Sequence, residues 1–197
     1  MRFDCQERLG HMIPPFNHSG VLPPFIGHAH ERHGRSPYPV SLKDIASRFA
    51  GSEPRKSLFD GFLRYRNELR SIGLSGFQWL DGSFVEDVET MRRRPPGDID
   101  VVTFAKRPEG VEADDSWEAF VRTRLDLFVP SEAKRLYHCD AYFVDLHSSQ
   151  PEWLVKLTSY WSGLFSHQRD TSLWKGMVQV SLEQDPDVEE KLEDTGR

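Results

Sequence analysis

The sequence predicts a single α/β domain in which helices and strands alternate along the chain. Three observations lead to this fold class. The chain has 197 residues, about the length of one domain. Apolar residues recur every three to four positions in several segments, and shorter apolar runs bounded by turn residues separate these segments. Hydrophobic residues make up 38% of the chain and aromatic residues 12%, which supplies enough apolar side chain for a core.

Residues 1–40 are predicted to form an N-terminal arm that is rich in proline and histidine. Prolines at this density prevent a regular helix, so we expect an extended arm that lies over the domain or reaches a partner protein. His28, His30 and His33 have a spacing that can bind a transition metal. Because no cysteine stands beside them to complete a zinc site, the favoured interpretation is a surface arm with scattered histidines.

Residues 41–182 are predicted to form the folded domain, which begins with two helices. Ser41 is the expected N-cap of a short helix that ends at Phe49. The second helix is expected from about residue 55 to residue 72, because apolar residues recur there at helical spacing and Gly73 follows. Two short apolar runs after this helix are expected to be strands: Phe77 to Leu80 and Asp98 to Phe104.

The second half of the domain is predicted to contain two more helices and two more strands. An amphipathic helix is expected from Trp117 to Phe128, closed before Pro130. The strands are expected over Asp140 to Leu146 and over residues 175–182. Between these strands Pro151 is expected to open a helix. Its aromatic residues have a helical spacing that favours core packing over base stacking: Trp153, Tyr160 and Trp161.

The charge of the chain excludes some classes of nucleic-acid-binding protein. The formal net charge is −6 and the pI is near 5.8, so the chain as a whole does not attract a phosphate backbone. Non-specific DNA binding is therefore not expected, and any contact with nucleic acid must be local. Residues 183–197, in which acidic residues outnumber basic ones, are expected to form a flexible tail.

The sequence also predicts a cytoplasmic protein without membrane contact. No apolar run approaches the roughly 18 residues that a membrane span requires, and the N-terminal residues lack the basic and apolar regions of a secretory signal. Two cysteines do not indicate a disulfide framework, so Cys5 and Cys139 are expected to be reduced. Because Cys139 has no evident activating partner, a buried structural thiol is favoured over a nucleophile.

Two carboxylates in the strand near residue 100 are the most informative feature. Side chains alternate between the faces of a strand, so Asp98 and Asp100 are expected to project from one face about 7 Å apart. Two negative charges this close are costly unless a cation neutralises them, and hard oxygen ligands suit Mg²⁺. Metal ions held in this way assist in-line displacement at phosphorus, so the pair indicates phosphoryl or nucleotidyl transfer.

The pair Gly82-Ser83 supplies the complementary element for a phosphate group. A glycine at the end of a strand allows a tight turn and a close approach of the backbone to a triphosphate. The serine hydroxyl and the following backbone amides can donate hydrogen bonds to the phosphates. Alone, Gly-Ser is an ordinary turn and two aspartates at a strand edge are often solvated, so the prediction depends on their joint occurrence.

Together these motifs resemble the nucleotidyltransferase superfamily, whose small members are minimal nucleotidyltransferases. Over roughly residues 12–182, the blocks LPPFIGHAH, WLDGSFVED, PPGDIDVV, DAYFV and KGMVQVSL are also similar to an uncharacterised bacterial family of nucleotidyltransferase-like proteins. The resemblance implies a nucleotidyltransferase (polymerase beta-like) fold with a mixed sheet flanked by helices, a divalent metal and an NTP donor. It matches Gly82 and Ser83 to the phosphate-binding pair, and Asp98 and Asp100 to the metal-binding pair.

The resemblance also implies a third acidic residue on a later strand, and the segment HCDAYFVDL offers two candidates. Asp140 and Asp145 are five residues apart, so they face opposite sides of a strand and only one can face the site. Asp140 is favoured because it stands at the start of the apolar run, where it would serve as a metal ligand or as general base for the acceptor hydroxyl. Asp145 would then be a solvated residue at the end of the strand.

Basic residues near these acids are candidates to bind the nucleotide. Fourteen residues separate Ser83 from Asp98, a longer gap than is usual in the minimal enzymes, and this insertion contains three consecutive arginines, Arg92, Arg93 and Arg94. Guanidinium groups bind phosphate through paired hydrogen bonds, so the arginines are candidates for the donor triphosphate, with a solvated basic loop as the alternative. Lys175 is a further candidate, although it can also simply flank a strand.

The resulting hypothesis is an enzyme that depends on Mg²⁺ or Mn²⁺ and transfers an NMP from an NTP to a hydroxyl group. Asp98, Asp100 and Asp140 would be both catalytic and metal-binding. The acceptor stays open among an RNA 3′ end such as that of tRNA, a protein side chain and a small molecule. The resemblance permits a role in a toxin–antitoxin or anti-phage module. Two alternatives are a catalytically silent module of the same fold that binds a partner protein through the arm, and a nucleic-acid binder without catalysis, which the net charge disfavours.

Overall fold

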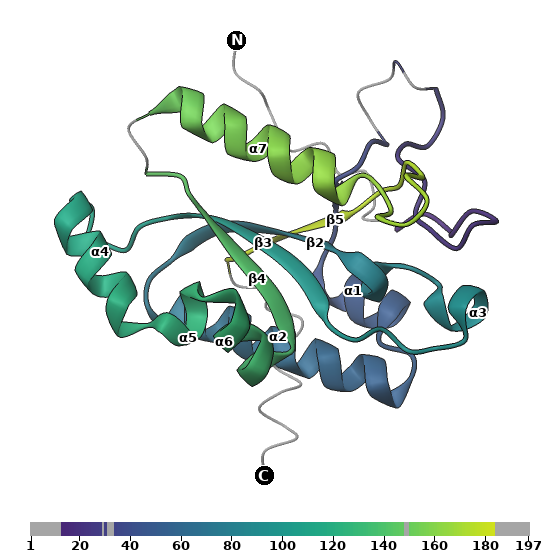
Figure 1. Ribbon diagram of the computed structural model, residues 1–197, viewed down its shortest axis with the longest axis horizontal. Helices are drawn as coiled ribbons and strands as arrows, with labels where there is room; N and C mark the ends of the chain where they lie inside the picture. The colour runs from purple at the N-terminus through teal and green to yellow at the C-terminus, as the bar shows by residue number, and fades with distance from the viewer. Residues whose placement is uncertain (1–12, 29, 31–33, 148–149, 184–197) are drawn as a thin grey trace.

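The computed structural model describes residues 13–28, 30, 34–147 and 150–183 of the chain. These residues form a five-stranded mixed sheet with the strand order β1-β5-β2-β3-β4, flanked by helices (Figure 1). The expected mixed sheet between helices is therefore confirmed. The strands are β1 (Tyr38–Pro39), β2 (Ser75–Asp81), β3 (Ile99–Lys106), β4 (Cys139–Asp145) and β5 (Val178–Ser181).

The directions of the strands bring three strand ends to one edge of the sheet. β2 is antiparallel to both β3 and β5, whereas β3 is parallel to β4 and β1 is parallel to β5. A parallel pair needs a crossover connection, which α4 (Asp114–Thr123), α5 (Leu125–Phe128) and α6 (Pro130–Tyr137) supply between β3 and β4. The C-terminal end of β2 therefore lies beside the N-terminal ends of β3 and β4.

Helices cover both faces of the sheet. α7 (Pro151–Phe165) lies on one face, and α2 (Glu53–Ser71) lies on the other with α5 and α6 (Figure 1). Alternate residues along each strand supply the two cores. The core under α7 consists of Trp79, Val102, Phe104, Val144, Trp161, Phe165 and Met177. The larger core on the opposite face includes Leu80, Val101 and Ala141 from the sheet and Phe62, Leu127 and Ala133 from the helices.

The first two helices begin and end close to the expected residues. α1 (Leu42–Phe49) has Ser41 as its N-cap: the Asp44 N–H donates to Ser41 Oγ at 3.1 Å, and the Ser41 N–H donates to the Asp44 carboxylate at 2.9 Å. This reciprocal pair is a capping box, and it satisfies two backbone N–H groups. α2 begins at Glu53, slightly earlier than expected, because a proline suits the first turn of a helix.

The crossover differs from the sequence prediction. The expectation of one helix from Trp117 to Phe128 was wrong, because the chain breaks at Arg124 into α4 and α5. The Arg124 guanidinium contacts Glu68 of α2 at 2.8 Å and Asp126 at 3.1 Å, and these ion pairs hold the break against α2. Two short helices, α6 and α3 (Val88–Arg92), were not predicted. A proline at the first turn opens α6 rather than only ending the preceding helix.

The described part of the arm packs on the domain. Val21 and Leu22 are fully buried, and the Gly176 N–H donates to the Leu22 carbonyl at 2.7 Å. The end of the arm forms β1, which pairs with β5. The rings of His28 and His30 stack with their centroids 5.7 Å apart. Three features of the sequence analysis lie outside the described residues: His33, Cys5 and the tail from residue 184.

Cys139 packs as expected, whereas two aromatic residues of α7 and the start of β5 differ from the prediction. Cys139 is buried and has a free thiol, and burial raises its pKa, as expected for a structural cysteine. On α7, Trp161 lies in the core, but Trp153 and Tyr160 are exposed, so core packing was wrong for these two. The last strand begins at Val178 rather than at residue 175. Among the described residues, no helix combines the length and the apolar character that crossing a membrane requires.

Candidate active site

Three aspartates form a row across one end of the sheet. Asp81 ends β2 and pairs in register with Asp100 of β3, which in turn pairs with Asp140 of β4. Side chains at paired positions on neighbouring strands project from the same face. The next row toward the middle of the sheet consists of Trp79, Val102 and Tyr142 and packs under α7. The three carboxylates therefore lie on the α7 face, just beyond its apolar core.

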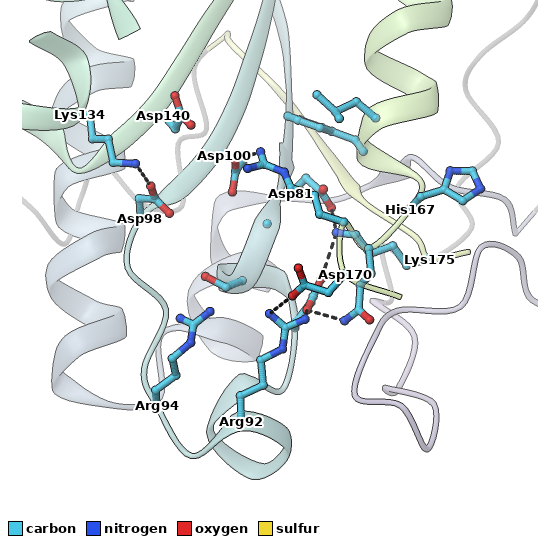
Figure 2. A pocket seen from close by; sticks show the side chains of 17 residues that line it. Asp81, Arg92, Arg94, Asp98, Asp100, Lys134, Asp140, His167, Asp170 and Lys175 are labelled. Atoms are coloured by element: carbon cyan, nitrogen blue, oxygen red, sulfur yellow. Dashed lines mark hydrogen bonds and ion pairs between the residues drawn. The ribbon is translucent and has the colours of Figure 1, made fainter. Parts of the chain in front are cut away.

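Asp98 adds a fourth carboxylate to this edge. It stands two residues before Asp100, directly outside β3, and lines the same cavity. Asp98 and Asp100 each have a cationic neighbour from another element, and Figure 2 shows that of Asp98. Asp98 forms an ion pair with Lys134 of α6, and Arg169 Nη2 lies 3.4 Å from Asp100 Oδ1.

The turn that contains Gly82 and Ser83 lies against Asp100. Gly82 has a φ of +76°, a conformation that favours glycine, and it begins the short 3-10 helix η1 (Gly82–Val85). A Cβ atom at this position would lie 1.7 Å from Asp100 Oδ2, so only a glycine leaves room for that carboxylate. Ser83 lines the same cavity as the aspartates. The structure therefore brings the two motifs into direct contact.

A cavity of about 260 Å³ connects these groups. Its charged lining has nearly equal numbers of acids and cations, and Figure 2 shows that they converge from several elements. The acids are Asp81, Glu86, Asp98, Asp100, Asp140 and Asp170, and the cations are Arg92, Arg94, Lys134, Arg169 and Lys175. Such a mixture can bind a ligand that carries both negative phosphate oxygens and a metal cation.

The electrostatics of the site favour additional positive charge at Asp100. Burial raises the pKa of Asp100 to about 6, and the negative charges of Asp98 and Asp140 add to this rise. Arg169 and Lys175 oppose the rise but do not cancel it. Because a neighbouring cation stabilises the ionised form of a carboxyl group, a bound divalent cation would lower this pKa again.

A buried lysine holds the base of the cavity together. Lys175 Nζ lies 2.5 Å from Asp81 Oδ1 and 3.2 Å from Glu86 Oε1, and all three side chains are less than 10% exposed. Gln168 donates to Glu86 Oε2 at 2.8 Å. Glu86, Arg92 and Gln168 also line a second cavity of about 430 Å³, so this network forms the partition between the two cavities. Lys175 therefore joins the end of β2, the residue that follows η1 and the segment before β5.

The arginines of the insertion occupy different positions. Arg92 ends α3 and reaches Glu86 at 3.8 Å and Asp170 at 3.9 Å, with its guanidinium at the cavity. Arg94 lines the cavity from the loop that leads to Asp98 (Figure 2). Arg93 adopts the left-handed conformation after α3 and is not among the lining residues. The structure thus brings two of the three arginines to the acids.

The two candidates for the third acid face opposite sides of β4. Asp140 lies in the row with Asp100 and lines the cavity. Asp145 lies at the other end of the strand, where it accepts hydrogen bonds from Arg107 Nε at 2.8 Å and pairs with Arg107 Nη2 at 2.7 Å. Its predicted role as a solvated residue was wrong, because its side chain is only 20% exposed and pairs with the side chain of Arg107, which is 6% exposed. Asp145 serves the fold, and Asp140 is the one placed at the cavity.

Comparison with protein families matches residues 14–181 to DUF6932, a family of unknown function. The chain belongs to the DUF6932 family. A search of curated proteins found no match, and a search of solved structures found none either. The match spans the sheet, the helices that flank it and every element that lines the cavity. The four aspartates and the Gly82-Ser83 turn are therefore part of the region that defines this DUF6932 chain as a family member.

The carboxylates have the oxygen chemistry that a divalent metal requires, although they are not gathered as ligands. Within the described parts of this DUF6932 chain, no group of three or more His, Cys, Asp or Glu side chains is arranged to hold a metal ion. Asp98 and Asp100 are instead directed to Lys134 and Arg169. The residues fit Mg²⁺ by type, and the charges of Asp98 and Asp140 help to raise the pKa of Asp100. A divalent cation held there would relieve this repulsion, provided that Lys134 and Arg169 move aside.

Sequence reasoning missed several residues of the site. Asp81 directly precedes Gly82, but its place in the row depends on the pairing of β2 with β3, which no local pattern reveals. Glu86 and Gln168 come from irregular segments. Lys134 lies on the helix that was not predicted, and Arg169 lies between α7 and β5. The only usable signal for Asp81 was its position at the end of an apolar run, directly before the turn.

Proposed function

We propose that this chain is a metal-dependent nucleotidyltransferase that transfers an NMP from an NTP to a hydroxyl group of an acceptor. The observation that carries the proposal is the meeting of Asp98, Asp100 and Asp140 at one cavity, which Gly82 and Ser83 also line. Asp100 lies against the turn at Gly82. The metal-binding half and the phosphate-binding half of the hypothesis come from separate segments of the chain. Their convergence on one cavity is not a consequence of either motif alone.

The metal would be held by Asp98 and Asp100, with Asp140 beside them. Bound there, Mg²⁺ or Mn²⁺ would neutralise the carboxylates and withdraw electron density from the phosphate oxygens of the donor. Burial is the main cause of the raised pKa of Asp100, and the charges of Asp98 and Asp140 add to it. A divalent cation would offset both influences because it stabilises ionised carboxylates, and this supports the assignment.

The chain's own residues would bind and orient the donor. The Ser83 hydroxyl and the backbone of the turn would donate hydrogen bonds to the phosphates, and Arg92 and Arg94 would pair with their charges. Lys175 was also a candidate for phosphate binding, but its ammonium group contacts Asp81 and Glu86. Its role in this proposal is to keep β2 and the turn in position.

In the proposed transfer step, the acceptor hydroxyl displaces pyrophosphate from the donor NTP. The acceptor hydroxyl oxygen forms a bond to the α-phosphorus, the bond from that phosphorus to the bridging oxygen breaks, and pyrophosphate leaves with the bonding electron pair. The proton of the hydroxyl passes to the Asp140 carboxylate, which lies in the row with Asp100. The acceptor is an RNA 3′ end, a protein side chain or a small molecule, and an anti-phage or toxin–antitoxin role would follow from its identity.

The test supplies the protein with each α-labelled NTP, Mg²⁺ or Mn²⁺ and a whole-cell extract, followed by separation of RNA, protein and small products. Labelled product is expected with wild type and is expected to be lost in the variant Asp98→Asn/Asp100→Asn. The matched control is Asp60→Asn/Asp115→Asn, which changes two exposed aspartates outside the cavity and should keep the activity. Label that persists in the Asp98/Asp100 variant, or no label with any NTP, would contradict the proposal.

A second candidate is a catalytically silent module of this fold that binds a partner protein. The observation in its favour is that Lys134 and Arg169 already neutralise Asp98 and Asp100. Nucleotide binding with and without Mg²⁺ separates the two candidates. Binding that ignores the metal and survives Asp98→Asn/Asp100→Asn would favour the silent module.

The third acid can be tested by comparing Asp140→Asn with Asp145→Asn. Asp140→Asn is expected to lower the rate of transfer by at least about 100-fold, the usual contribution of a general base, and to leave stability nearly unchanged. Asp145→Asn is expected to keep the activity but to lower the free energy of unfolding by about 1–3 kcal/mol, because Arg107 loses one of the two carboxylates with which it pairs and keeps only Asp114. Urea denaturation and the labelled transfer assay measure the two effects. A reversed pattern would exchange the roles of the two residues.

A further inference from the structure

Two cations near Asp98 and Asp100 differ from the other cations of the cavity. Lys134 projects from α6 to Asp98 (Figure 2). Arg169 belongs to the segment between α7 and β5 and pairs with Asp100. The two acids that would hold a metal are thus each paired with a cation from a different element.

Both side chains are largely exposed to solvent. The side chain of Lys134 is 53% exposed and that of Arg169 is 72% exposed, and the 3.4 Å contact of Arg169 is long for a charged hydrogen bond. Ion pairs with this exposure contribute little free energy, because water screens the charges and holding long side chains in place costs entropy. Lys175, in contrast, is 3% exposed and is held by two carboxylates.

Bound ligands would give Lys134 and Arg169 other partners than Asp98 and Asp100. A divalent cation at Asp98 and Asp100 would repel Lys134 and Arg169, which compete with it for the same oxygens. A triphosphate in the cavity would supply new oxygens within reach of the flexible stems of these residues. The cations would then move from carboxylate to phosphate without leaving the cavity.

We propose that Lys134 and Arg169 are phosphate-binding residues that neutralise Asp98 and Asp100 until metal and triphosphate bind. This inference rests on the proposed function and adds to it two residues that the sequence motifs do not contain. It predicts that the two residues have opposite effects on the two ligands. They oppose binding of the metal alone, and they favour binding of the triphosphate.

The test uses the variant Lys134→Ala/Arg169→Ala with Mn²⁺ and inorganic tripolyphosphate as separate probes. The dissociation constant for Mn²⁺ alone, measured by electron paramagnetic resonance, is expected to fall roughly 2- to 30-fold, the range for losing two partly exposed ion pairs. The dissociation constant for tripolyphosphate without metal, measured by calorimetry, is expected to rise by a similar factor. Changes of opposite sign are not expected from a general loss of structure.

Two controls accompany this variant. Arg135→Ala removes the next residue of α6, an exposed arginine that pairs with Glu132 outside the cavity, and should change neither constant. Lys134→Arg/Arg169→Lys keeps both charges and should behave like wild type.

The outcomes separate this inference from the proposed function. If wild type binds neither Mn²⁺ nor tripolyphosphate, the proposed function fails and this inference fails with it. If wild type binds both but Lys134→Ala/Arg169→Ala does not shift the two constants in opposite directions, only the role of Lys134 and Arg169 is overturned.

Discussion

Replacing Lys175 with methionine is expected to lower the free energy of unfolding by about 3–5 kcal/mol, the usual cost of removing one partner from a buried ion pair. The reason is that Asp81 and Glu86 would both keep buried carboxylates without the ammonium group that neutralises them. Burial already raises the pKa of Asp81, and the charge of Lys175 is the main influence that opposes this rise. Urea denaturation followed by tryptophan fluorescence measures the loss.

Two further variants show whether the loss comes from unpaired charge. Lys56→Met removes a lysine whose ion pair with Glu53 is exposed, so it should change stability little. Adding Asp81→Asn and Glu86→Gln to Lys175→Met should restore part of the lost stability, because the buried charges are then gone. A loss below about 1 kcal/mol for Lys175→Met would mean that the ion pairs of Lys175 with Asp81 and Glu86 do not hold the two ends of η1 in place.

Replacing Gly82 with alanine is expected to reduce transfer by more than about 100-fold, the effect of moving a reacting group by roughly 1 Å. The new Cβ would lie 1.7 Å from Asp100 Oδ2, so either the carboxylate or the turn must shift. The φ of +76° adds strain of about 1–2 kcal/mol for any residue with a side chain. The labelled transfer assay and Mn²⁺ binding measure the loss, and circular dichroism checks that the domain stays folded.

Gly97 offers a matched control for this substitution. It lies in the loop that leads to Asp98, and a Cβ there would meet no atom within 4 Å. Gly97→Ala should therefore keep both transfer and metal binding. Full activity of a folded Gly82→Ala protein would show that the contact between the turn and Asp100 has no part in the reaction.

Secondary structure was predictable wherever interactions within a few residues create it. The capping box at Ser41 and the helical spacing in α2 are local, and both helices lie close to their expected bounds. The break at Arg124 was not predictable, because it is held by Glu68 on another helix. Short helices such as α3 span too few residues for an apolar period to be visible.

The candidate site also contains residues that local motifs predicted and residues whose position depends on the fold. Asp98, Asp100, Gly82 and Ser83 were found from the sequence, because two short motifs carry them. The alternation of a strand showed that only one of Asp140 and Asp145 could face the site, and Asp140 was favoured because it stands at the start of the apolar run. The structure places Asp140 at the cavity and Asp145 on Arg107. Arg92 and Arg94 reach the cavity and Arg93 does not, which depends on how the chain turns after α3.

The order of amino acids was therefore sufficient for the α/β class, for the longer helices α1 and α2 and for the two motifs, since each depends on neighbours in the chain. Folding in three dimensions was needed to place Asp81 beside Asp100, and to bring Lys134 and Arg169 to the acids. The physical reason is that strand register and helix packing are set by contacts between segments tens of residues apart. Charges that meet through such contacts leave no periodic pattern in the sequence.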